Sequence, residues 1–99
     1  MDKLVHVAIT VSNIEQAVSW YQGSFSCEVL YQTETEAMLK FANTNLQLIL
    51  PSQRPSHLAF QKNDAETFGT LKQNKDGSRS CFISDSTGNL VEVIAPGED

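Results

Sequence analysis

A short pattern occurs twice in the chain, and this repeat limits the folds that 99 residues can adopt. The segment HVAIT begins at His6, and the segment HLAFQ begins 51 residues later at His57, so that each histidine heads an apolar run. The ends of the copies match as well, because a shift of 45 residues places Gln47 on Glu92. Repetition of this kind is the signature of a duplicated structural module. The chain therefore reads as two related modules, the second about six residues shorter.

The first copy is predicted to be a strand, a helix and three further strands. Residues 4–11 alternate between an apolar face and a less apolar face that carries His6, which is typical of a strand covered on its apolar side. Ser12 and Glu15 match a capping box, which predicts a helix over about residues 13–22. Runs rich in β-branched, aromatic and leucine residues predict strands at about 27–33, 36–42 and 45–50.

The second copy follows the same plan in fewer residues. It opens with a strand at His57, and Asn63 and Glu66 match a second capping box, which predicts a helix over about residues 64–73. Its smaller length indicates the loss of a central strand or of part of this helix. Two strands end the copy, at about 79–84 and 89–95, and are joined by a turn in which Gly88 supplies a positive φ.

The paired pattern resembles the vicinal oxygen chelate superfamily, which includes glyoxalase I, extradiol dioxygenases, methylmalonyl-CoA epimerase and bleomycin-resistance proteins. The resemblance extends over residues 4–96 and is carried by the two histidines, the helix SNIEQAVSWYQ and the ending DSTGNLVEVIAP. This ending is similar to the superfamily's D-P-D-G-N-x-x-E, with Ser86 and Thr87 in place of Pro and Asp.

The resemblance implies an α+β fold in which each βαβββ module forms a half-barrel, with a cleft between the two halves. One glyoxalase-like domain is expected over residues 1–99. Its first module would span about residues 4–51, and its shortened second module about residues 55–96.

The resemblance also implies a metal site, because the superfamily's ligand positions match His6, Gln47, His57 and Glu92. The residue types agree in part: two imidazoles and one carboxylate form a set that holds divalent Ni, Co, Mn, Zn or Fe and leaves positions open for a substrate. Glu92 is the strongest member, because a carboxylate inside the apolar strand LVEVI would be costly to bury without a cation or donors. A histidine in a strand is more often a hydrogen-bonded residue than a ligand, so a structural role stays open.

Gln47 departs from the glyoxalases, which commonly place a glutamate there as ligand and base. A neutral amide can coordinate only through its oxygen or hydrogen-bond a substrate. Glu92 is then the one obvious general base, and we expect it to be the catalytic residue.

Three function classes remain open. The first is a metal-dependent, glyoxalase-like lyase or isomerase that acts on a small substrate with vicinal oxygens. The second is an Fe(II) extradiol-type dioxygenase, which would need a further acid–base histidine, although both histidines of the chain are already assigned as ligands. The third is a metal-free protein that sequesters a drug, as bleomycin-resistance proteins do, for which an acidic dimer would suit a cationic ligand.

The amino-acid composition limits the binding partners and the location that can be expected. A net charge of −5 argues against binding to nucleic acid or an anionic membrane, because such affinity comes from basic patches. The sequence has no apolar run long enough to span a bilayer, so a cytoplasmic protein is expected. Cys27 and Cys81 lie singly inside apolar runs, which favours two reduced thiols. The expected partners are a small-molecule substrate and a second copy of the chain, since two short modules leave strand edges exposed.

Overall fold

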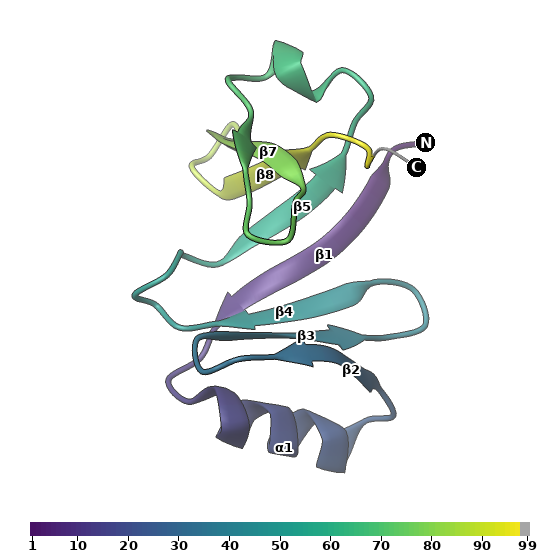
Figure 1. Ribbon diagram of the computed structural model, residues 1–99, viewed down its shortest axis with the longest axis vertical. Coiled ribbons are helices and arrows are strands. Elements are labelled where there is room, and N and C mark those ends of the chain that lie inside the picture. Colours follow the sequence, from purple (N-terminus) through teal and green to yellow (C-terminus); the bar gives the residue numbers. More distant parts are fainter. Residues whose placement is uncertain (98–99) are drawn as a thin grey trace. The chain divides into compact units, whose positions relative to one another are not determined.

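The computed structural model describes residues 1–97 and divides the chain into two compact units (Figure 1). One unit runs from His6 to Ser56, and the other joins Met1–Val5 to the chain from His57 onward. The division falls inside the first strand, β1 (Lys3–Thr10), between Val5 and His6. Strand β1 thus belongs in part to each unit.

The N-terminal unit contains one α-helix and four strands. In chain order β1 is followed by α1 (Ile14–Ser24), β2 (Glu28–Gln32), β3 (Glu36–Lys40) and β4 (Asn45–Ile49). The strands are ordered β2-β3-β4-β1; β1 and β4 are parallel, and the two hairpin pairs are antiparallel. These bounds confirm the predicted helix and the predicted strands to within about two residues.

The C-terminal unit repeats this order with a much shorter helical segment. Strand β5 (His57–Gln61) is followed by the 3₁₀ turn η1 (Ala65–Thr67), β6 (Lys72–Gln73), β7 (Arg79–Ser84) and β8 (Leu90–Ile94). The strands are ordered β5-β8-β7-β6, with β5 and β8 parallel and the other pairs antiparallel. Each strand has a counterpart in the first copy, so the α+β class and the shortened second copy are confirmed.

The predicted helix over 64–73 is wrong, and it is where the second copy lost its residues. Only Ala65–Thr67 is helical, and β6 begins at Lys72. Asp64 holds the N-cap position but makes no side-chain capping bond. The segment continues into Gly69 and Thr70, which have low helix propensity, so nothing local extends the turn.

The two predicted capping boxes are also wrong. Helix α1 begins at Ile14, one residue later than expected, and its N-cap is Asn13, whose side-chain oxygen accepts the Gln16 amide at 2.9 Å. Asparagine and serine are about equally good caps, so the pattern alone could not decide between neighbouring candidates. Gly88 does have a positive φ, of 94°, as the turn requires.

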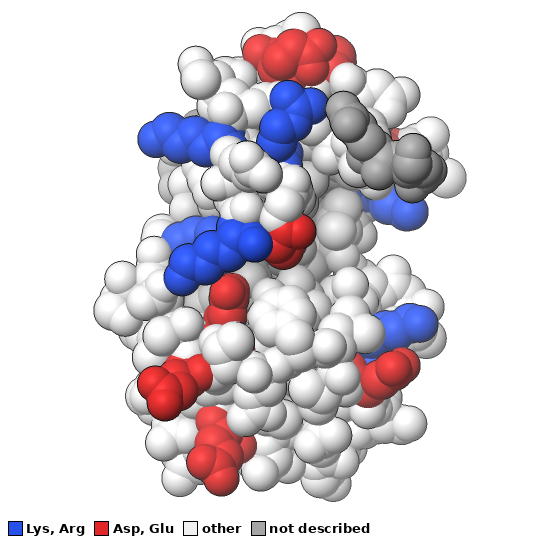
Figure 2. Space-filling view, viewed as in Figure 1, with Lys and Arg blue, Asp and Glu red and all other residues white. Residues whose placement is uncertain are grey.

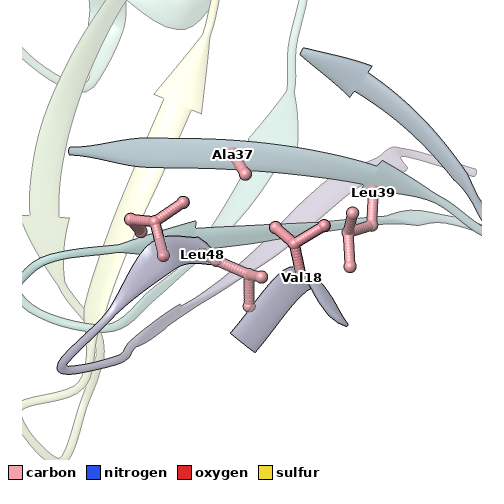
Figure 3. Close-up of a cluster of buried hydrophobic side chains, with 5 residues drawn as sticks. Val18, Ala37, Leu39 and Leu48 are labelled. Carbon is pink, nitrogen blue, oxygen red and sulfur yellow. The ribbon is translucent and has the colours of Figure 1, made fainter. Parts of the chain in front are cut away.

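Different side chains fill the two units. In the N-terminal unit, α1 covers a cluster of larger apolar residues: Ile14, Val18, Ala37, Leu39 and Leu48 (Figure 3). The C-terminal cluster is smaller and consists of Ala65, Cys81, Val93 and Ala95. On β1 the more deeply buried residues are His6 and Ala8, so the less apolar face of this strand is the more covered one. The prediction that the apolar face of this strand is the covered one is therefore wrong, although alternation separated the two faces correctly.

The cysteines, the helices and the surface charges can be compared with the composition. Both cysteines are free thiols, with Cys81 buried and Cys27 partly buried. Within residues 1–97, no helix has the length and apolar character needed to cross a bilayer. Acidic and basic side chains are interspersed on the face shown in Figure 2.

Candidate functional site

The strand register places the four predicted ligand residues at equivalent points of the two copies. In the first copy Ala8 pairs with Gln47, and in the second Ala59 pairs with Glu92. Each histidine lies two residues before the paired alanine, on the same face of its strand, because side chains alternate along a strand. All four predicted ligand residues are buried: His6, Gln47, His57 and Glu92. The repeat detected in the sequence is therefore a repeat of register.

In the C-terminal unit, His57 and Glu92 form a buried pair. The imidazole Nε2 of His57 lies 3.3 Å from the carboxylate Oε1 of Glu92, and their side chains are 0% and 6% exposed. The ring of Phe82 packs edge-on against His57, with 5.3 Å between the centroids. Burying a carboxylate is unfavourable unless opposite charge or donors compensate it. This pair is thus a place where a cation would be favourable.

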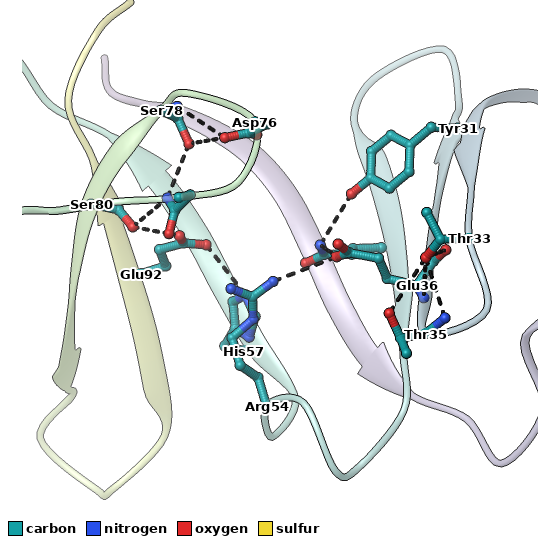
Figure 4. A network of polar contacts seen from close by, with 12 residues as sticks. Tyr31, Thr33, Thr35, Glu36, Arg54, His57, Asp76, Ser78, Ser80 and Glu92 are labelled. Atoms are coloured by element: carbon teal, nitrogen blue, oxygen red, sulfur yellow. Dashed lines mark hydrogen bonds and ion pairs between the residues drawn. The ribbon is translucent and has the colours of Figure 1, made fainter.

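The second oxygen of Glu92 is held by the neighbouring strand β7. The Ser80 hydroxyl donates to Glu92 Oε2 at 2.7 Å, and Ser80 itself is buried (Figure 4). The amide nitrogen of Asn74 in turn donates to the hydroxyls of Ser78 and Ser80, at 3.0 Å each. The Ser78 hydroxyl donates to Asp76 Oδ1 at 2.6 Å. A continuous set of hydrogen bonds thus connects an exposed loop to the buried carboxylate.

In the N-terminal unit, Gln47 is held by the neighbouring strands β2 and β3. Its Nε2 donates to the carboxylate of Glu36 at 3.0 Å and to the hydroxyl of Tyr31 at 3.3 Å (Figure 4). A carboxylate can only accept, so the amide nitrogen must face Glu36 and the oxygen must face away. Gln47 Oε1 is buried and has no hydrogen-bond partner among residues 1–97. A buried acceptor of this kind calls for an additional group.

Glu36 carries a second contact that bears on its chemistry. An Arg54 guanidinium nitrogen lies 3.6 Å from Glu36 Oε2, and the two side chains are 34% and 22% exposed. Glu36 is therefore a carboxylate with partial access to solvent beside a buried amide. A proton-transferring group needs such access to its substrate.

Sequence reasoning missed Glu36 and Ser80, although the hairpins point to both. Each antiparallel pairing puts a β3 or β7 residue opposite the ligand position: Met38 pairs with Gln47, and Phe82 with Glu92. Glu36 and Ser80 each lie two residues earlier and thus share the face of their ligand residue. The short turns between the strands fix this register and could have been used to find them.

Neither a protein-family model nor a curated protein matches the sequence, but solved structures match its fold. Methylmalonyl-CoA epimerase from Mycobacterium tuberculosis superimposes with a TM-score of 0.79 and 20% identity over 97% of this chain and 89% of that one. A glyoxalase/bleomycin resistance protein/dioxygenase superfamily member from Vibrio splendidus gives 0.74 and 13% identity over 97% and 100%. The chain therefore shares the fold of these proteins.

A third solved structure is similar over nearly its whole length. Streptomyces coelicolor methylmalonyl-CoA epimerase, in complex with 2-nitronate-propionyl-CoA, has a TM-score of 0.77 and 19% identity over 97% of this chain and 98% of that one. The expected glyoxalase-like fold with a shortened second module is thus confirmed. At these identities the similarity concerns the fold, and the chemistry has to be argued from the side chains.

Proposed function

We propose that this protein is a divalent-metal-dependent isomerase of the vicinal oxygen chelate superfamily, which moves a proton next to a carbonyl group of a small substrate with vicinal oxygens. The observation that carries the proposal is the buried pair of His57 and Glu92, with 3.3 Å between its facing atoms. The structural neighbours that are named as epimerases support an isomerase over the other reactions of the superfamily.

The residue types support a metal at this position. His57 and Glu92 offer one imidazole nitrogen and one carboxylate oxygen 3.3 Å apart, and the sequence repeat implies His6 as a further ligand. Two imidazoles and one carboxylate suit Mn, Fe, Co, Ni or Zn and leave coordination positions for a substrate. All three residues are buried, which favours an ion that compensates the carboxylate.

Gln47 is proposed as a fourth ligand through Oε1. Its amide nitrogen is occupied by Glu36 and Tyr31, whereas its buried oxygen has no hydrogen-bond partner in the described part of the chain. Amide oxygens are weak, neutral ligands. With Glu92 as the only charged ligand, a divalent ion would keep a net charge of about +1 and favour an anionic oxygen ligand.

Glu36 is proposed as the general base in place of Glu92. Both oxygens of Glu92 have contacts, Oε2 with Ser80 and Oε1 with His57, which suits a ligand. Glu36 is partly exposed and touches the proposed ligand Gln47, so it supplies from β3 the carboxylate that position 47 lacks. A bound divalent ion would polarise the carbonyl and stabilise the enolate. Glu36 would take up the proton and return it.

Proton exchange tests this function. Protein loaded with Co, Ni, Mn or Zn is incubated in D2O with methylmalonyl-CoA or with the hemithioacetal of methylglyoxal and glutathione, and deuterium uptake is followed by NMR. We expect metal-dependent exchange on at least one probe. Glu36→Gln should lower its rate about 10²- to 10⁴-fold, the usual contribution of a general base. Glu34→Gln, which changes an exposed neighbouring carboxylate, is the control.

Two results would contradict the proposal. Absence of exchange on both probes with every metal would contradict isomerase activity. An undiminished rate in Glu36→Gln would remove Glu36 as the base and return that role to Glu92. Tight binding of a cationic drug without any metal would instead favour the sequestering class.

A further inference from the structure

We propose that Ser80 and Asn74 position Glu92 for metal binding, through a hydrogen-bond chain in which Asn74 donates to Ser80 and Ser80 donates to Glu92. This inference rests on the proposed metal site and assigns two residues that act through its carboxylate ligand. Carboxylate ligands of metals are usually oriented by hydrogen bonds from such neighbours.

The direction of each bond follows from counting hydrogens. A serine hydroxyl has one hydrogen to donate and two lone pairs to accept with. Ser80 lies 2.7 Å from Glu92 Oε2, and Ser78 lies 2.6 Å from Asp76 Oδ1. Ionised carboxylates only accept, so both hydroxyl hydrogens must point toward the carboxylates. The side chain of Asn74, which contacts both hydroxyls, must then present its NH2 group to them.

The consequence for Glu92 is a fixed orientation. Because Asn74 donates to the Ser80 oxygen at 3.0 Å, the Ser80 hydrogen has a defined direction toward Glu92 Oε2. The other oxygen, Oε1, faces His57 at 3.3 Å, and through it Glu92 would bind the proposed ion. A carboxylate held by one oxygen binds metal through the other without first losing rotational freedom, which favours binding.

The loop that carries Asn74 is itself rigidly bonded. The backbone N–H of Asn74 donates to the Ser78 carbonyl at 2.7 Å, and the backbone N–H of Gly77 donates to the Asn74 carbonyl at 3.0 Å. Gly77 has a φ of 90°, a conformation that favours glycine in such a turn. The turn therefore holds the Asn74 side chain in place while its own tip is exposed.

The position of Ser80 in the C-terminal copy corresponds to that of Glu36 in the N-terminal copy, where the residue accepts a hydrogen bond and does not donate one. Ser80 pairs with Ile94, and Glu36 with Ile49, each two residues beyond the ligand position. Glu36 accepts from the amide of Gln47, whereas Ser80 donates to the carboxylate of Glu92. Each ligand residue thus has an orienting partner of matching polarity at one repeated position. Such matching is independent support for an orienting role of Ser80.

Cobalt binding tests the inference. Apo protein is titrated with Co²⁺ against a chromophoric chelator, and the visible absorption of bound Co²⁺ is recorded as a report on ligand geometry. We expect Ser80→Ala to weaken affinity about 10- to 100-fold and to change the spectrum. Asn74→Ala should act in the same direction with a smaller effect. Ser78→Ala, which removes the outer contacts with Asp76 and Asn74 and leaves the contact of Asn74 with Ser80, is the control and should match wild type in both readouts.

The outcomes separate the two proposals. If wild type binds Co²⁺ and both Ser80→Ala and Asn74→Ala keep its affinity and spectrum, the positioning role is wrong while the metal site stands. If wild type binds no Co²⁺, the metal site and the positioning role both fail. A change in Ser78→Ala as large as that in Asn74→Ala would show a general loop effect and would also overturn the inference. Urea unfolding of each variant confirms that it is folded.

Discussion

The two copies share one arrangement of strands but differ in what covers it. In the N-terminal copy the eleven residues of α1 lie over Leu39 and Leu48, which are fully buried. In the C-terminal copy the three residues of η1 place Ala65 against small side chains such as Cys81 and Ala95. The ligand positions keep the same register in both. The strand pairing, rather than the helix, therefore preserves the register of the candidate ligand positions.

The copies also differ in the polarity of their ligand positions. The N-terminal one is a neutral amide whose partner Glu36 is an acceptor, and the C-terminal one is a carboxylate whose partner Ser80 is a donor. Where the ligand position changes from an amide to a carboxylate, the position of its partner changes from a carboxylate acceptor to a hydroxyl donor. In the proposed function, the C-terminal copy would contribute the charged ligand and the N-terminal copy the carboxylate that acts as base.

The largest expected effect concerns the unequal cores. Leu39→Ala should lower the free energy of unfolding by about 2–5 kcal/mol, because it leaves a cavity beneath α1. Val93→Ala, a truncation in the buried cluster of the C-terminal copy, removes less volume and should cost about 2 kcal/mol. Urea unfolding followed by circular dichroism measures both. Equal losses would indicate that the two cores contribute alike to stability.

The next effect tests the polarity of the ligand positions. Gln47→Glu would set a second carboxylate against Glu36 in place of an amide donor at 3.0 Å. We expect it to lower the free energy of unfolding by about 1–3 kcal/mol at pH 8, since a buried hydrogen bond is replaced by repulsion between like charges. Adding Glu36→Gln should restore most of the loss in a double-mutant cycle. If Gln47→Glu is as stable as wild type, the hydrogen bond from the Gln47 amide to Glu36 does not contribute to stability.

A smaller effect compares the two helical starts. Asn13→Ala removes the oxygen that accepts the Gln16 amide and should cost about 1 kcal/mol. Asp64 holds the same position before η1, but its side chain makes no capping bond. Asp64→Ala should therefore change the free energy of unfolding by no more than about 0.5 kcal/mol. Thermal unfolding of both variants makes the comparison. The difference disappears if η1 is capped in solution.

The smallest effect concerns the turn between β7 and β8. The Asn89 side chain and the amides of Thr87 and Asn89 donate to Asp85 and hold its pKa at about 2, below its ordinary value of 3.8. A depressed pKa favours folding above about pH 4, and this contribution is lost as the pH falls toward 2. Asp85→Asn should therefore flatten the stability curve between pH 4 and pH 2. An NMR titration of the Asp85 carboxyl that finds its ordinary pKa would contradict this.

The sequence predicted most of the strands because the repeat constrained them twice. Apolar alternation and short turns located seven of the eight strands, whereas the two-residue β6 has no pattern of its own. The second helix was predicted wrongly because its capping pattern at Asn63 and Glu66 is compatible with a single turn. The helix propensity of three residues is the same for a single turn and for the start of a helix. The shortening of this segment shows only in the six-residue difference between the two offsets of the repeat.

The candidate site was predictable in its ligand positions and not in their surroundings. His57 and Glu92 lie together as the repeat implied, because equal register brings equivalent residues to equivalent points. The contacts of Gln47 with Glu36 and of Glu92 with Ser80 depend on cross-strand neighbours, which are distant in sequence. Their residue types have no common motif, so they emerge only once the hairpin register is known.

The central claim is that the C-terminal copy supplies a buried histidine–carboxylate pair for a divalent ion. Thermal unfolding of the apo protein with increasing Mn, Fe(II), Co, Ni or Zn tests it directly. At a free metal concentration a hundredfold above Kd, we expect wild type to be stabilised by about 2.7 kcal/mol. Glu92→Gln and His57→Ala should lose this stabilisation, and Glu66→Gln, an exposed control in the same unit, should keep it. An unchanged melting temperature of wild type with all five metals would contradict the claim.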